Sequence, residues 1–360
     1  MKLTDYRTLG KSGLIVSPLA LGTMTFGNTQ WGSTDEVSKQ MFDQYVDAGG
    51  NFVDTADVYS NGESERLIGK FIDDRKLRDS IVLSTKYSFH QGVLDAKPSS
   101  DKAANPNSGG NGRKNLYRSV DNSLKNLGTD YIDMYWMHVW DMVTPLEEVL
   151  QSMDNLVKAG KIRYYGFSDM PAWYAAKGSA LAKAYNTAPP IAQQMHYALT
   201  ERTLEQEHIP SAIDSGQGTV IWSPLAYGFL TGKYGNDGNG NLADGDGRLN
   251  KFNPMFPEVT EKHWHILDVL RSVSKESGHS MAQLALAWVT QQKGVTSTLI
   301  GASKLSQLQA NIDSLQIEFS DEHLRKLNDA SKLSMVNPYL IFNPAVIDNA
   351  VFGGNSVKSL

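Results

Sequence analysis

The sequence predicts an α/β fold: a single (β/α)8 (TIM) barrel domain over residues 1–360, with an N-terminal β-hairpin and extra C-terminal helices. Short apolar runs that are typical of strands buried on both faces begin near residues 19, 51, 80, 131, 162, 191, 219 and 297. Segments with helical spacing lie between them. Alternation of strand and helix repeated eight times is typical of a closed barrel or of a doubly wound sheet.

Polar residues end the predicted strands, and the common step between them is about 30 residues, which is the length of one βα unit. They are Asp54, Lys86, His138, Ser168, Gln194 and Ser223. One step, from Lys86 to His138, is longer because it contains an insertion. Helices are expected over 33–48, 63–73, 113–127, 145–159, 171–185, 205–215, 259–276, 281–291 and 304–314. The hairpin, YRTLGKSGLIVS (6–17), precedes the first unit and is expected to plug the opposite end of a barrel.

Two Gly/Asn/Ser-rich stretches indicate long rim loops, at about 91–114 and within 227–257. The tail over 334–360 is apolar and interrupted by Pro and Asn, so we expect it to pack against the barrel.

Composition excludes several classes of function. The net charge is −5 and no run of Lys or Arg is present, which argues against nucleic acid as a partner. The absence of cysteine excludes disulfides, thiolate metal sites and cysteine nucleophiles. The polar N-terminus and the lack of an apolar run of about 18 residues predict a cytoplasmic protein with no membrane partner.

Four ionisable residues are expected at one rim, because active sites of TIM barrels lie at the C-terminal ends of the strands. Asp54, Lys86 and His138 end the second, third and fourth strands, and Tyr59 follows Asp54 by five residues. A nearby ammonium lowers the pKa of a phenol, so Lys86, held by Asp54, would make Tyr59 a usable general acid. His138 would hydrogen-bond the substrate carbonyl oxygen.

These residues lie in motifs that resemble the aldo-keto reductase superfamily: VDTADVYSNGESERLIGK, LSTKYSF, YIDMYWMH, YGFSDMPAW, IWSPLAYGFLTGKY and LIGASKLSQLQANI, in this order. The resemblance runs from about residue 7 to residue 315 and is greatest to aryl-alcohol dehydrogenase-like and potassium channel β-subunit-like members. It implies that Asp54, Tyr59, Lys86 and His138 form the family's catalytic tetrad. It also implies reversible, NADPH-dependent reduction of an aldehyde or ketone.

The sequence has neither a Rossmann glycine motif nor a Walker loop, so a dinucleotide would have to be bound by barrel loops. The resemblance implies an NADPH/NADP+ site made by Gly22, Thr23, Met24, Asp54, Ser168, Asp169, Gln194, Trp222, Ser223, Pro224, Leu225, Lys233, Arg248, Gly301, Ser303, Lys304, Gln307 and Asn311. Position 169 is Asp where many relatives have Asn, and Ala310 replaces an acidic residue. A carboxylate cannot donate to the carboxamide, so the first departure puts one cofactor contact in doubt.

Five aromatic side chains are expected to line the substrate pocket: Phe26, Trp31, Tyr87, Phe89 and Trp140. They would favour a small-molecule carbonyl substrate that is aromatic or bulky. The alternative function is an NADP(H)-binding sensor or scaffold subunit with little turnover. A metal-dependent hydrolase has only the His263-Trp264-His265 pair in its favour, and this pair falls in a predicted helix, so no metal site is expected.

Overall fold

Eight parallel strands close into a barrel with the neighbour order β10-β3-β4-β5-β6-β7-β8-β9. The computed structural model describes residues 1–28, 32–90, 105–243, 245, 249–250 and 258–357. The strands are β3 (Leu19–Gly22), β4 (Phe52–Asp54), β5 (Val82–Tyr87), β6 (Ile132–Met137), β7 (Ile162–Ser168), β8 (Ala192–His196), β9 (Gly218–Trp222) and β10 (Val295–Ile300). Each coincides with a predicted apolar run, so the predicted TIM barrel is confirmed and the doubly wound sheet is excluded.

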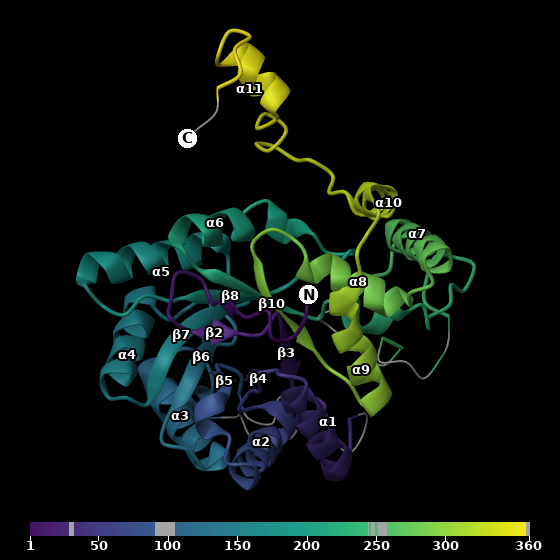
Figure 1. Ribbon diagram of the computed structural model, residues 1–360. Helices are drawn as coiled ribbons and strands as arrows, with labels where there is room; N and C mark the ends of the chain where they lie inside the picture. Colours follow the sequence, from purple (N-terminus) through teal and green to yellow (C-terminus); the bar gives the residue numbers. More distant parts are fainter. Residues whose placement is uncertain (29–31, 91–104, 244, 246–248, 251–257, 358–360) are drawn as a thin grey trace.

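Helices surround the barrel and cover the outer face of the strands (Figure 1). Those around the barrel are α1 (Asp35–Asp47), α2 (Glu63–Asp74), α3 (Arg113–Leu127), α4 (Leu146–Lys158), α5 (Ala172–Tyr185), α6 (His208–Ser215), α7 (Glu261–Ser277), α8 (Met281–Thr290), α9 (Leu305–Asp313) and α10 (Asp321–Ser331). α11 (Pro344–Ala350) lies in the tail, away from the barrel. Short 3-10 turns are η1 (Tyr59–Gly62), η2 (Arg78–Ser80), η3 (Pro106–Ser108), η4 (Thr203–Glu205), η5 (Ala226–Thr231) and η6 (Ser314–Gln316). None of the helices in the described part of the chain has the length and apolarity needed to cross a membrane.

The helix ends follow local capping chemistry. The Thr34 side chain accepts from the backbone N–H of Val37 at the start of α1, and Ser280 forms a capping box with Gln283 at the start of α8. Gly128 ends α3 in the left-handed conformation. These signals are local, and the nine predicted helices agree with α1–α9 to within three residues at each end.

The side chains of each strand alternate between two apolar layers. Residues that face the helices join the larger core, which includes Leu83, Tyr135 and Phe167. Residues that face the barrel interior form a second core that includes Phe52, Val82 and Met134. The interior layer lies toward the N-terminal ends of the strands, which leaves the C-terminal ends for polar side chains.

An antiparallel hairpin of β1 (Arg7–Thr8) and β2 (Ile15–Val16) closes the N-terminal end of the barrel. Leu9 and Val16 are fully buried in the interior core. Gly10 has φ +63°, and a Cβ there would lie 2.6 Å from the Gly216 carbonyl oxygen, so only glycine fits. The predicted plug is thus present, opposite the rim formed by the C-terminal ends of the strands.

The tail after α10 contradicts the expectation that it packs on the barrel. Figure 1 shows the segment with α11 projecting away from the barrel. Val336, Ile341 and Phe342 are 52%, 53% and 61% exposed. Apolar composition predicts that a segment can be buried, but it does not specify a surface to bury it against. The Asn-Pro pairs at 337–338 and 343–344 interrupt the helical periodicity that would have presented one face to the barrel.

Candidate active site

The four ionisable residues predicted from strand ends meet at the C-terminal rim of the barrel. Asp54 is the last residue of β4, and it is opposite Ser84 of β5 in the parallel register. Lys86 lies two residues beyond Ser84 and therefore on the same face of β5. His138 directly follows β6, where its backbone N–H donates to the Tyr87 carbonyl oxygen at 2.8 Å. Tyr59 begins η1, in the loop after β4.

Asp54 and Lys86 form a buried ion pair, with side chains only 2% and 1% exposed. The Lys86 Nζ donates to Asp54 Oδ2 and, at 2.7 Å, to the Thr55 carbonyl oxygen. Asp54 Oδ1 accepts from Ser84 Oγ at 2.5 Å and from Gln194 Nε2 at 3.2 Å. Both carboxylate oxygens thus have partners, which fixes the position of the ammonium.

The lysine keeps its charge despite burial. Burial alone would lower the pKa of Lys86, but the charge of Asp54 and the contact with Tyr59 outweigh it and raise that pKa above its ordinary value. The site therefore contains a permanent cation at neutral pH.

Tyr59 lies beside this cation, and its pKa corrects one expectation. The Lys86 Nζ is 5.0 Å from the centre of the Tyr59 ring. Burial raises the pKa of Tyr59 by more than the charge of Lys86 lowers it, so the net shift is upward rather than downward. The expectation from sequence counted the ammonium but not the desolvation of the phenolate. The phenol consequently holds its proton at neutral pH.

Local backbone strain positions this phenol. Ser60 and Asn61 have φ +49° and +53°, and Gly62 has φ +83°. Such left-handed conformations are uncommon outside glycine and require support from the surroundings. Ser60 Oγ provides some of it by donating to the Phe26 carbonyl oxygen at 3.1 Å. The tight turn lets the chain leave β4, present Tyr59 at the rim and enter α2 within a few residues.

His138 completes the group as a neutral imidazole. Its ring centre lies 6.0 Å from that of Tyr59 and 4.7 Å from that of Phe89, both edge-on. Burial, assisted by the charge of Lys86, holds the pKa of His138 well below its usual range. The buried Nδ1 atom has no hydrogen-bond partner within the described part of the protein. A neutral imidazole retains one N–H that can donate to an oxygen atom.

Residues expected to hold the nicotinamide end of a cofactor converge beside this group. The Trp222 Nε1 donates to Asp169 Oδ1 at 3.0 Å, and Gln194 reaches Asp54 as described above. Ser168 is 1% exposed, and its Oγ has no partner among the described residues. A buried hydroxyl without a partner is costly, so it marks a place where a polar ligand group fits.

Sequence reasoning missed His196 at the end of β8. Its ring stacks on Trp222 with centres 4.7 Å apart and an interplanar angle of 22°, and Tyr227 meets Trp222 edge-on. Burial lowers the pKa of His196 to about 4, so the stacked imidazole is neutral. The signal was present in the sequence, because His196 is two residues beyond Gln194 and shares its face of the strand.

The remaining expected cofactor residues occupy two other parts of the rim. Gly22, Thr23 and Met24 leave β3, and the buried Thr23 donates to the Asp54 carbonyl oxygen from both its N–H and its Oγ1. Ser223, Pro224 and Leu225 follow β9; Ser223 has φ +50°, and its Oγ accepts from the backbone N–H of Tyr227. The Lys233 Nζ lies 5.0 Å from the Tyr234 ring centre. Arg248 lies outside the described residues.

A separate group gathers at the N-terminus of α9, which follows β10. A Cβ at Gly301 would meet no atom within 4 Å, so the backbone there faces open space. Gln307 accepts from the N–H and Oγ of Ser303, and the Asn311 amide donates to the Gly301 carbonyl oxygen at 3.3 Å. Lys304 is the exposed N-cap residue. Open backbone, a helix N-terminus and a lysine together fit a phosphate group.

Two of the residues expected to line the substrate pocket are buried in the apolar core. Phe26 is 1% exposed and packs edge-on against Phe71, while Tyr87 is fully buried and stacks on Tyr135. Tyr87 follows Lys86 directly, so strand alternation turns it toward the helices when Lys86 faces the interior. Phe89 and Trp140 are partly exposed, and Trp140 packs edge-on against Trp173. Trp31 lies outside the described residues.

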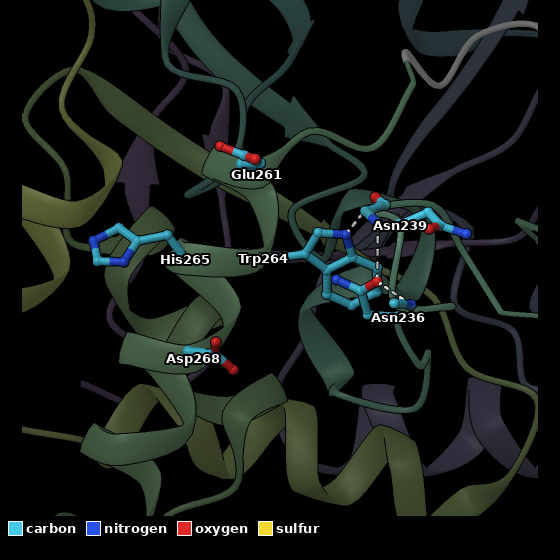
Figure 2. Close-up of a pocket in the computed structure, with 8 residues that line it drawn as sticks. Asn236, Asn239, Glu261, Trp264, His265 and Asp268 are labelled. Carbon is cyan, nitrogen blue, oxygen red and sulfur yellow. Dashed lines mark hydrogen bonds between the residues drawn. The ribbon is translucent and has the colours of Figure 1, made fainter.

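A pocket of about 440 Å³ lies elsewhere, between α7 and the loop that carries Asn236 and Asn239 (Figure 2). Trp264 points toward this loop and donates from Nε1 to the Gly240 carbonyl oxygen at 2.7 Å. His265 also lines the pocket, whereas His263 caps its own helix by accepting from the Thr260 N–H. No member of the ionisable group at the rim contributes to its lining, so this pocket is not the candidate active site.

Comparison with known proteins agrees with the geometry. The model of the aldo/keto reductase family matches residues 18–332. The chain is 35% identical to norsolorinic acid reductase of Aspergillus flavus over 92% of this chain and 82% of that protein. It is 33% identical to aryl-alcohol dehydrogenase [NADP(+)] of Phanerodontia chrysosporium, over 95% and 89% of the two chains. It is 36% identical to the uncharacterized oxidoreductase YrpG of Bacillus subtilis, over 90% and 95%.

Proposed function

Because the chain belongs to the aldo/keto reductase family and is therefore an oxidoreductase that acts on carbonyl groups, we propose that it uses NADPH and that Tyr59 is the proton donor. The observation that carries this proposal is the convergence of Tyr59 with the Asp54–Lys86 pair and His138 at one rim. NADPH, when bound, supplies the hydride. Every other element of the reaction comes from side chains of this chain.

Tyr59 gives its proton to the carbonyl oxygen as negative charge develops on that oxygen. Its own burial keeps the phenol protonated until then, and Lys86 stabilises the phenolate left behind. Asp54 holds the ammonium in place through the buried pair. The neutral His138 donates one hydrogen bond to the substrate oxygen, which orients the carbonyl group. In alcohol oxidation the same groups act in reverse.

The rim residues would hold the cofactor in three parts. Ser168, Asp169 and Gln194 would contact the carboxamide, with Trp222 against the nicotinamide ring. The turn after β9, with Lys233, would follow the pyrophosphate. The N-terminus of α9, with Lys304, would take the 2′-phosphate. The unpartnered Ser168 hydroxyl and the open backbone at Gly301 support this assignment, and the lysines favour NADPH over NADH.

We further propose that the substrate is an aromatic carbonyl compound. Phe89, edge-on to His138, and the partly exposed Trp140 offer aromatic surface beside the proton donor. A relative is named for an aryl alcohol, which agrees with this chemistry.

The test is NADPH consumption, followed by absorbance, with a panel of aryl and alkyl aldehydes and ketones. Turnover with an aryl aldehyde is the expected result. Tight NADPH binding without turnover on any member of the panel would instead favour a nucleotide-sensing or scaffold protein.

Tyr59→Phe is expected to lower kcat by about 10²- to 10⁴-fold, because it removes the proton donor while leaving the ring in place. The dissociation constant for NADPH is expected to stay within about twofold. Tyr185→Phe removes a hydroxyl from a tyrosine on α5 that is 58% exposed, and serves as the matched control. Wild-type activity in Tyr59→Phe would show that another group donates the proton.

A further inference from the structure

Asp169 places a second carboxylate at the rim, beside the Asp54–Lys86 pair. It follows β7 directly and has φ +42°, a left-handed conformation that is uncommon for a residue with a side chain. Its backbone is hydrogen-bonded to residues on both sides. The Asp169 N–H donates to the Gln194 carbonyl oxygen, and the Asp169 carbonyl oxygen accepts from the Trp140 N–H. The side chain is held at a defined place by the hydrogen bond from Trp222.

This carboxylate lacks a cation of its own. Within the described part of the chain, no Lys, Arg or His forms an ion pair with it, whereas Asp54 has Lys86 as its partner. Burial raises the pKa of Asp169 to about 7, against the smaller opposing effects of the Trp222 hydrogen bond and of Lys86. A buried carboxylate that ionises near neutral pH gains from a positive charge brought beside it.

The only change of charge in the nicotinamide ring is between its two redox states, since the oxidised ring is a cation and the reduced ring is neutral. We infer that Asp169 makes this site favour the oxidised, cationic nicotinamide over the reduced ring. This inference rests on the proposed function, because it requires the ring to lie against Trp222 and Asp169. It goes further in assigning to Asp169 a selectivity between redox states in addition to its contact with the carboxamide.

Trp222 should contribute to the preference for the cationic nicotinamide ring. An indole N–H that donates to a carboxylate forms a charge-assisted hydrogen bond and increases the electron density of the ring. An aromatic face attracts a cation, most strongly when the face is electron-rich and shielded from water. The imidazole stacked on Trp222 belongs to the neutral His196, so it adds no opposing charge.

The other charged and titratable groups near Asp169 do not cancel its effect. Lys86 on β5 carries a fixed positive charge that Asp54 on β4 already neutralises. His138 after β6 and His196 on β8 are neutral at neutral pH, because burial lowers both pKa values. Tyr59 keeps its proton, and the charge of Asp169 contributes to that. Asp169 is therefore the group among these that changes charge near neutral pH.

The experiment compares the dissociation constants of NADP+ and NADPH by calorimetry for the wild type and for Asp169→Asn. Asparagine keeps the shape and can accept from Trp222, but it removes the charge. The expected result is that NADP+ binding weakens relative to NADPH by about tenfold, on the order of the interaction between two charges at such a site. Asp154→Asn is the matched control, because Asp154 is a buried carboxylate on α4 that contacts Ala188 before the N-terminal end of β8.

A second measurement uses the unaltered protein. The preference of the wild type for NADP+ over NADPH is expected to grow as pH rises from 6 to 8.5, because Asp169 is uncharged at the acid end and charged at the basic end. The 2′-phosphate, common to both cofactors, cancels in the ratio.

An unchanged ratio in Asp169→Asn, or a wild-type ratio that does not vary with pH, would overturn the inference while leaving the proposed function intact. Failure of the wild type to bind either cofactor would overturn both.

Discussion

At the scale of single residues, neighbouring groups in the site have different protonation states. Lys86 stays charged because Asp54 compensates its burial, and Tyr59 stays protonated because nothing fully compensates its burial. His138 stays neutral for the same reason as Tyr59, since burial penalises whichever form carries charge. All three groups are buried, and only Lys86 has a partner whose charge outweighs that burial. Lys86 is therefore charged, whereas Tyr59 and His138 are neutral.

The buried pair makes a prediction about stability. Lys86→Met leaves the Asp54 carboxylate buried without its cation, so the free energy of unfolding should fall by about 3–5 kcal/mol. Lys158→Met is the control, because Lys158 is 68% exposed and its pair with Asp154 on α4 should contribute less than about 1 kcal/mol. Denaturant unfolding measures both. A loss below about 1 kcal/mol in Lys86→Met would mean that Asp54 takes up a proton or water at little cost.

The sequence was sufficient to bring the four ionisable residues together, because Asp54, Lys86 and His138 lie at the ends of parallel strands that share one rim, and Tyr59 lies in the loop that follows β4. It was not sufficient for Phe26, which lies in the loop after β3 and is buried by contacts such as that with Phe71. The direction of Tyr87 could have been predicted from strand alternation, because it directly follows Lys86 on β5. The net direction of the Tyr59 pKa also depends on three-dimensional burial, which spacing along the chain does not contain.

At the scale of elements, the two faces of the hairpin should contribute differently to the free energy of unfolding. Leu9 is fully buried in the interior core, whereas Ile15 on β2 is 53% exposed. Leu9→Ala should lower the free energy of unfolding by about 2–5 kcal/mol, because it leaves a cavity in the barrel interior. Ile15→Ala should change it by less than about 0.5 kcal/mol.

Both hairpin variants should bind NADPH as the wild type does, because the plug and the catalytic rim lie at opposite ends of the barrel. Denaturant unfolding and calorimetry check the two parts of the prediction. Equal destabilisation by the two variants would contradict the assignment of Leu9 to the interior core.

Helices and strands could be predicted where short stretches of the sequence carry the signal for them. Helical spacing located α1–α9, and apolar runs located all eight barrel strands. The order of the strands around the barrel also follows from right-handed βαβ connections between sequential parallel strands. The direction of the tail was not predictable, because it depends on a surface that the segment itself does not encode.

At the scale of the whole molecule, the barrel and the tail are separate energetic units. The barrel buries two apolar cores and its plug, and α10 belongs to it: Leu327 is 1% exposed, and Arg202 donates to Ser331 Oγ at 2.8 Å. Beyond Lys332, whose carbonyl oxygen accepts from Lys262 Nζ, the side chains that follow are largely exposed. Folding of the barrel should therefore gain little from the tail.

Deletion of residues 334–360 should change the melting temperature by less than about 2 °C, because exposed side chains contribute little to the free energy of unfolding. Activity on an aryl aldehyde should also persist, since the described part of the tail, 334–357, projects away from the barrel. A longer deletion from Asp321 removes α10 with the buried Leu327, and should lower the melting temperature by several degrees or prevent folding. Differential scanning calorimetry compares the two truncations. A large loss of stability on removing 334–360 alone would contradict this prediction. It would mean that the tail is buried against another surface in solution.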